Sequence, residues 1–228
     1  MASTACYTLR LHAVAAPLWV GLTPALERMS TSTQPSAQEQ ISTLYRILTE
    51  AQTSFDLWEG LREARSDQAT VDAMQRYSVF FTGTESALLD SFIVLLYSLF
   101  ETRRDTINFH TLLHTLDLTL SATQKTDLAD RVKALKANWL KLGILRNEVV
   151  GHQALNQSPV QSFAKAAISP QEIQDYLIGS QALLGYISST LFSTCLSFNV
   201  KGKPYLERLL TDMRSNNSFK PNPLRGSA

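Results

Sequence analysis

Apolar side chains recur at helical spacing along four long segments of this chain. The first follows a capping-box pattern, Ser36–Glu39, and keeps its period to about residue 64. The second covers about residues 70 to 103, with Thr82–Glu85 as a possible kink or restart. A third begins at the capping pattern Ser121–Gln124, and a fourth at Ser169–Glu172, where a proline occupies the first helical position. No strand pattern interrupts these segments, so the sequence predicts an all-α fold, specifically an up-down four-helix bundle with short accessory helices.

Two longer connections and a C-terminal segment accompany these helices. Asp105–Leu120 is predicted to be a loop with one short helix at about Phe109–Leu116. Residues 153–168 are predicted to be a polar connection without a helix. A further short helix is predicted near Pro204–Met213, before a tail rich in Asn, Pro and Ser that cannot bury enough surface to order.

These elements divide the chain into one domain and two flanking regions. Residues 36–198 are predicted to form the four-helix domain, and residues 199–228 the short helix and a disordered tail. Residues 1–35 are predicted to be an extension, either disordered or upstream of a native start at Met29. The apolar run after Arg10 resembles the hydrophobic region of a signal peptide, but a histidine and a proline interrupt it and no basic cluster precedes it.

Composition limits the partners and the compartment. With 44% hydrophobic residues and a net charge of +1, the chain can bury one core but has no globally basic surface, so a nucleic acid must be held by a local patch. The two cysteines, Cys6 and Cys195, are interpreted as free thiols, which predicts a reducing compartment, the cytoplasm. No zinc spacing and no phosphate-binding glycine loop are present, so neither a metal nor a cofactor is expected.

A membrane-spanning segment is not expected either. The longest apolar run, Leu88–Phe100, has only about thirteen residues and contains Asp90, which is too short and too polar to cross a bilayer. This run is instead predicted to be the most buried helix of a soluble domain.

Arg146 stands out because it occupies an apolar position of its own helix. The stripe that marks the core-facing side of this helix consists of Leu128, Val132, Leu135, Trp139, Leu142 and Val149, with Arg146 between the last two. A guanidinium in such a position costs several kcal/mol unless an anion meets it. A partner carboxylate or a bound phosphate would do so, and Glu85 is the candidate carboxylate because it falls on the apolar stripe of the second helical region.

Three pieces of the chain, in order, resemble the HEPN superfamily, and most closely the HEPN proteins of abortive-infection systems. They are the apolar helix Ala87–Glu101, the segment Thr106–Leu113, and a helix ending in Arg146-Asn147 that is followed by His152. The resemblance covers roughly residues 37 to 198 and implies a four-helix fold that works as a homodimer. For active members it also implies metal-independent cleavage of RNA, not DNA, in which the ribose 2′-hydroxyl attacks its own phosphate. A defence or toxin-like role, with a possible neutralising partner protein, follows from the same resemblance.

The residue types suit that reaction. His152, whose side chain has an unperturbed pKa near 6.5, would move a proton to or from a ribose oxygen. Arg146 would hold the non-bridging phosphate oxygens while negative charge builds in the transition state. Asn147 would orient the histidine or the ribose.

In an unbroken helix, Arg146 and His152 would be about 9 Å apart along the axis and would face different sides. Either Gly151 ends the helix and lets His152 fold back, or two chains pair so that each contributes to one cleft. The second arrangement is the one that the resemblance implies.

Other residues near the motif are assigned supporting or RNA-binding roles. Glu148, like Glu85, is a supporting candidate. Lys133, Lys136 and Lys141 form either a solvated face or a path that leads RNA toward Arg146. Family members that are switched off by tyrosine modification carry a tyrosine two residues after the histidine; here Ala154 occupies that position, which puts this control in doubt.

The chain also contains a second pair with the same spacing, Arg104 and His110. This pair follows the second long helix and not the third, so it is expected to lie in a connecting segment outside the active cleft.

The alternative to a nuclease is a non-catalytic helical module that binds a protein or RNA. In that case Arg146 would form a buried ion pair with Glu85, and His152 would cap the end of its helix. A metal site at Glu148 and His152 is disfavoured, because no second matching pair exists to complete it.

Overall fold

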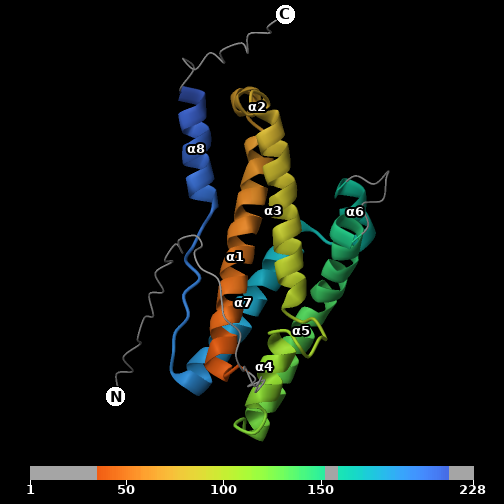
Figure 1. The fold of residues 1–228 in the computed structure, drawn as a ribbon, viewed down its shortest axis with the longest axis vertical. Coiled ribbons are helices and arrows are strands. Elements are labelled where there is room, and N and C mark those ends of the chain that lie inside the picture. The colour runs from red at the N-terminus through yellow and green to blue at the C-terminus, as the bar shows by residue number, and fades with distance from the viewer. Residues whose placement is uncertain (1–34, 152–158, 216–228) are drawn as a thin grey trace, which may run out of the picture.

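The computed structural model describes residues 35–151 and 159–215, and every long regular element in those ranges is a helix. The four longest are α1 (Ala37–Ala64), α3 (Ser78–Ser98), α5 (Ala122–Arg146) and α7 (Pro170–Phe192). Helix α1 packs against α3 and α7, and α5 packs against the same two helices, so the four enclose one core (Figure 1). The predicted all-α fold is confirmed.

The shorter helices cover the ends and one side of this core. They are α2 (Gln68–Gln75), α4 (Phe109–Leu116), α6 (Pro159–Ala166) and α8 (Lys203–Ser215). Helix α4 packs on α1 at one end of the molecule, α6 packs on α5, and α8 lies along α1 and α2 (Figure 1). The short helices predicted near residues 109–116 and 204–213 are confirmed.

Three predicted helix starts are confirmed as capping boxes, at Ser36, Ser121 and Ser169. At Ser36, for example, the hydroxyl oxygen accepts from the Glu39 backbone N–H at 3.3 Å, while the Glu39 carboxylate accepts from the Ser36 backbone N–H at 2.7 Å. Each box satisfies backbone N–H groups that have no partner within the first helical turn.

The break in the second helical region lies at residues 76–77, between α2 and α3, and not at Thr82–Glu85. Thr82–Glu85 is inside α3, so the predicted restart there is wrong. Tertiary packing decides the position, because Met74 of α2 and Phe81 of α3 both enter a small apolar cluster. The other buried members of this cluster are Leu61, Leu206 and Leu210. A local capping pattern is worth less than the burial of these side chains.

Helix α6 corrects the prediction of a helix-free connection over residues 153–168. The ring of Phe163, in α6, stacks on Trp58 of α1 with centroids 5.7 Å apart, and Ala166 and Ile168 are buried. An isolated helix of eight residues is marginal in water, so α6 depends for its stability on the residues it packs on.

The apolar segment Leu88–Phe100 is buried on one side only, which corrects the expectation that it is the most buried helix. Phe92, Ile93 and Leu96 are fully buried, whereas Val94 is 41% exposed. Helix α1 buries more side chains than α3 does, because it packs on α3, α4, α7 and α8.

The prediction that no apolar segment is long enough to cross a bilayer is wrong for α3. By length and composition alone, this helix of 21 residues is apolar enough to cross a bilayer. An 18-residue window of it has a mean hydropathy of 1.5, and 28% of the window is buried in the protein. Core helices of water-soluble proteins meet the same criterion, so no membrane assignment follows.

Cys195, just after α7, is disulfide-bonded, so the prediction of a free thiol at this position is wrong. Cys6 lies outside the described residues. Disulfides are typical of oxidising compartments, so the cysteines do not support the predicted location in the cytoplasm.

Candidate functional site

Arg146 is the last residue of α5 and lies half-buried beside α3. Its guanidinium carbon is 5.3 Å from the centre of the Tyr97 ring, and Nη1 donates to Asn147 Oδ1 at 3.2 Å. Leu128, Leu135 and Leu142, on the same stripe, are buried as predicted. The stripe therefore directs Arg146 toward α3, where its guanidinium makes a cation–π contact with the Tyr97 ring.

Tyr97 is held in place by α5 itself. Trp139 stacks on it with centroids 5.6 Å apart, and the indole N–H donates to the Tyr97 carbonyl oxygen at 3.1 Å. A Cβ atom added at Gly143 would lie 3.2 Å from the Tyr97 ring, so the glycine permits this close approach of the two helices. Sequence reasoning missed Tyr97, although an isolated glycine inside a helical pattern signals such a contact.

Glu85 does not pair with Arg146; it forms an ion pair with Arg65, at the end of α1. The predicted alternative, a buried Arg146–Glu85 pair, is therefore wrong. Arg146 lies beside Tyr97, and Glu85 precedes Tyr97 by twelve residues of α3, or about 18 Å at the helical rise per residue. Hydrophobic period indicates the face of a helix on which a residue lies, but not which residue on a neighbouring helix stands at the same level.

After Arg146 the chain continues as a π-helical turn, η1 (Asn147–Gly151), so α5 neither runs on regularly nor stops before Gly151. Asn147 is exposed on this turn. The Glu148 carboxylate accepts from Lys165 Nζ of α6 at 2.7 Å, and this ion pair ties the turn to the neighbouring helix. π-Helical turns are rare and are frequently found at functional sites.

His152 and Ala154 lie outside the described residues. Of the three predicted catalytic residues, the structure thus places Arg146 and Asn147, next to each other at the junction of α5 and η1. Among the described residues, no group of three His, Cys, Asp or Glu side chains is arranged to hold a metal ion.

The three lysines of α5 that were predicted to bind RNA differ in their contacts. Lys133 and Lys136 are exposed, whereas Lys141 forms an ion pair with Glu172 at the start of α7. This contact and the capping bonds from the Ser169 hydroxyl and backbone N–H lower the pKa of Glu172 from 4.5 to about 2. Lys141 thus links two helices of the core and is less available to a ligand than the other two lysines.

The depressed pKa makes stability depend on pH. A carboxyl group with a lowered folded-state pKa stabilises the fold above its unfolded-state pKa, and this contribution is lost as the pH falls through the folded-state value. We therefore expect wild type to exceed Glu172→Gln in free energy of unfolding near neutral pH, and the difference to shrink between pH 4.5 and about 2. Urea denaturation of both proteins across this range measures the difference, and a constant difference would contradict the assignment.

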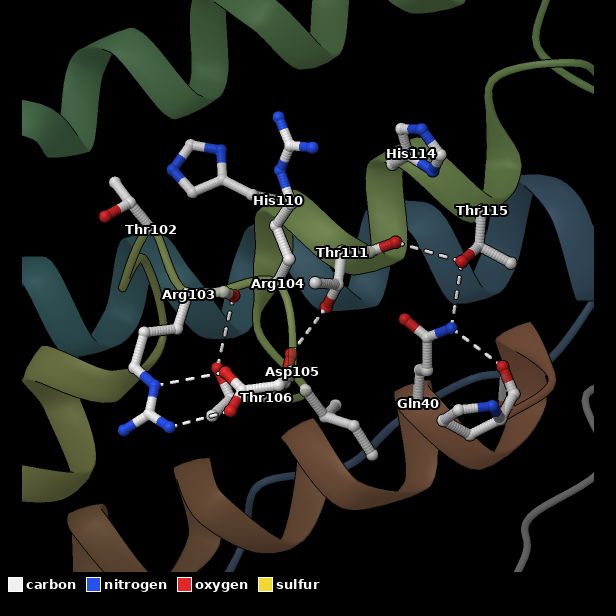
Figure 2. Close-up of a pocket in the computed structure, with 12 residues that line it drawn as sticks. Gln40, Thr102, Arg103, Arg104, Asp105, Thr106, His110, Thr111, His114 and Thr115 are labelled. Atoms are coloured by element: carbon white, nitrogen blue, oxygen red, sulfur yellow. Dashed lines mark hydrogen bonds and ion pairs between the residues drawn. The ribbon is translucent and has the colours of Figure 1, made fainter. Parts of the chain in front are cut away.

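Arg104 and His110, the second pair with the spacing of the motif, line the same pocket (Figure 2). The pocket has a volume of about 690 Å³ and is formed by the connection from α3 to α4, the outer face of α4, and the start of α1. The two residues share this pocket because the loop that follows α3 packs back against the first turn of α4. That they lie outside the active cleft stays a prediction.

Comparisons of the chain with protein-family models, with curated proteins and with solved structures find no match.

Proposed function

We propose that this protein is a metal-independent endoribonuclease of the HEPN type, with Arg146, Asn147 and His152 as its catalytic residues. One observation carries the proposal. The half-buried Arg146 has no carboxylate partner among the described residues, since Glu85 is bound to Arg65 and Glu148 to Lys165. A guanidinium held in place without a counter-charge is suited to bind a phosphate.

The arrangement of the long helices supports the HEPN-type, up-down form of the bundle. In Figure 1 neighbouring long helices run in alternating directions, and each packs against two others. Of the three pieces of sequence that carry the resemblance, Ala87–Glu101 includes the second half of α3 and Thr106–Leu113 runs into α4. The third begins at the end of α5.

In the proposed reaction the ribose 2′-oxygen attacks the adjacent phosphorus, and the bond to the 5′-oxygen breaks. His152 takes the 2′ proton or gives a proton to the leaving 5′-oxygen, and a cyclic phosphate remains. Arg146 stabilises the charge on the non-bridging oxygens, and Asn147 orients the ribose or the histidine. The exposed Lys133 and Lys136 lead the RNA along α5.

The activity itself is tested with the full chain and mixed RNA in excess chelator. We expect fragments that end in a cyclic phosphate, detected by mass spectrometry of the 3′ ends. A requirement for added metal would contradict the proposed chemistry.

The composite site requires two chains, and we propose a two-fold homodimer with residues 140–153 near the axis. Two apolar side chains of α5 in this region, Leu140 and Ile144, are 53% and 42% exposed, which supports a covered face there. We expect light scattering at micromolar concentration to give about 51 kDa, twice the 25.4 kDa of one chain, and an interface of more than about 1,000 Å². A stable monomer would exclude a site shared between two chains.

A non-catalytic binding module of the same fold is the second candidate. It is favoured by the contacts that Arg146 already makes to Tyr97 and Asn147, which partly satisfy the guanidinium without a substrate. RNA binding without cleavage, lost in Arg146→Ala, would support this candidate.

The biological setting is part of the proposal. We place the protein in a defence or toxin-like system, with a neutralising partner protein. Toxicity on expression that is abolished by His152→Ala would support this setting, and toxicity unaffected by that change would favour the binding module.

A further inference from the structure

The pocket beside α4 carries excess positive charge. Its one carboxylate, Asp105, is bound by Arg103 through two hydrogen bonds of 3.0 and 2.7 Å. Arg104 is exposed, and no carboxylate among the described residues pairs with it. His110 and His114, one turn apart on α4, also line the pocket, and in Figure 2 the Arg104 guanidinium projects between their rings.

The residues that carry this charge are tied to one another. The fully buried Asn108 donates from Nδ2 to the Arg103 carbonyl oxygen at 2.9 Å, and its Oδ1 accepts from the Thr111 backbone N–H at 2.9 Å. The loop that carries Arg104 is thereby joined to the first turn of α4. The rings of Phe100 and His110 meet edge to face with centroids 6.0 Å apart, and this contact orients His110. The pocket is therefore organised before any ligand arrives.

The floor of the pocket offers hydrogen bonds to a neutral, polar ligand body. Gln40 is 2% exposed, and its Nε2 donates to the Pro35 carbonyl oxygen at 2.8 Å and to Thr115 Oγ1 at 2.9 Å. A carbonyl oxygen accepts but cannot donate, so these bonds fix the orientation of the amide. Its Oε1 then points away from both partners in Figure 2, toward the middle of the lining residues, and no donor among the described residues reaches it.

We propose that this pocket binds a small phosphate ester rich in hydroxyl groups, of the size of a mononucleotide. Arg104, His110 and His114 supply N–H donors for the phosphate, and Gln40 with the neighbouring threonines faces the hydroxyl groups. The volume of about 690 Å³ lies within the range of about 300–1,000 Å³ usual for small-molecule sites. The site is distinct from Arg146 and goes beyond the proposed nuclease function.

The test is isothermal titration calorimetry of the full chain with four probes: adenosine monophosphate, ribose 5-phosphate, ribose and inorganic phosphate. We expect the two phosphate esters to bind, ribose not to bind, and inorganic phosphate to bind more weakly. Arg104→Gln should weaken binding of the esters by about tenfold or more, because a charged hydrogen bond to phosphate is lost. Arg208→Gln is the matched control, since Arg208 is an exposed arginine of α8 outside the pocket.

A second variant tests the floor. Gln40→Met should weaken binding of both phosphate esters but leave inorganic phosphate unchanged, with the melting temperature as a check on folding. No binding of either ester, or equal loss in Arg104→Gln and Arg208→Gln, would overturn the proposal. Binding of RNA oligonucleotides alone, lost in Arg104→Gln, would also overturn it and make the pocket a contact for an RNA backbone.

The outcome is separable from that of the nuclease. Arg146→Ala should leave binding of adenosine monophosphate unchanged even where RNA cleavage is lost, and Arg104→Gln should leave the chemistry at Arg146 intact. Loss of nucleotide binding in Arg146→Ala would show that the two sites are one.

Discussion

Replacement of Arg146 by alanine is expected to lower RNA cleavage by about a hundredfold or more. The guanidinium is the one positioned positive charge at the α5–η1 junction that has no carboxylate partner among the described residues. Removing a group that stabilises transition-state charge typically costs about two to three orders of magnitude in rate. Single-turnover cleavage of a defined RNA in chelator measures the effect, and His152→Ala should show a loss of similar size.

Arg131→Ala is the matched control. Arg131 lies on the same helix and also covers a tyrosine, with its guanidinium carbon 4.3 Å from the centre of the Tyr186 ring. The two variants lose the same kind of contact, so a general weakening of α5 would affect both alike. His110→Ala, in the pocket beside α4, should retain cleavage within about a few fold. If cleavage survives both Arg146→Ala and His152→Ala, or depends on His110 instead, the proposed site is wrong.

The largest expected effect on stability belongs to Phe92 of α3. Its side chain is fully buried, and the centroid of its ring lies 5.3 Å from the ring centroids of both Phe55 and Trp58 on α1. Phe92→Ala should lower the free energy of unfolding by about 3–5 kcal/mol, because it removes apolar contacts and leaves a cavity. Urea denaturation gives the difference.

Phe80 of the same helix provides the comparison. It is 61% exposed, and Phe80→Ala should change the free energy of unfolding by less than about 1 kcal/mol. Equal losses in the two variants would contradict the packing of α3 on α1, whereas the expected difference would confirm which face of this apolar helix enters the core.

The helices themselves could be predicted from sequence, since their determinants are local. A capping serine and the glutamate or glutamine three residues later are joined by hydrogen bonds within one turn, and this holds at Ser36, Ser121 and Ser169 alike. The stripe Leu128, Leu135 and Leu142 also identified the buried side of α5, because side chains repeat on a helix face whatever it packs against.

Features that depend on a second helix could not be predicted in this way. The break before α3 and the formation of α6 follow from burial against residues far away in the chain, at Leu206 and Trp58. The same is true of the partners of charged groups. Glu85 shares the right face for Arg146 but lies about 18 Å too far along α3, and Arg65 pairs with it instead.

The sequence by itself determined the all-helical fold, the main helix starts and the apolar position occupied by Arg146. Only the tertiary structure decided that Tyr97 and not Glu85 meets this arginine, and that Arg104 and His110 line a common pocket. The physical reason is the separation along the chain over which each interaction acts. Capping bonds and helical period act over a few residues of one segment, whereas an ion pair or a pocket depends on the level at which separate segments come to lie side by side.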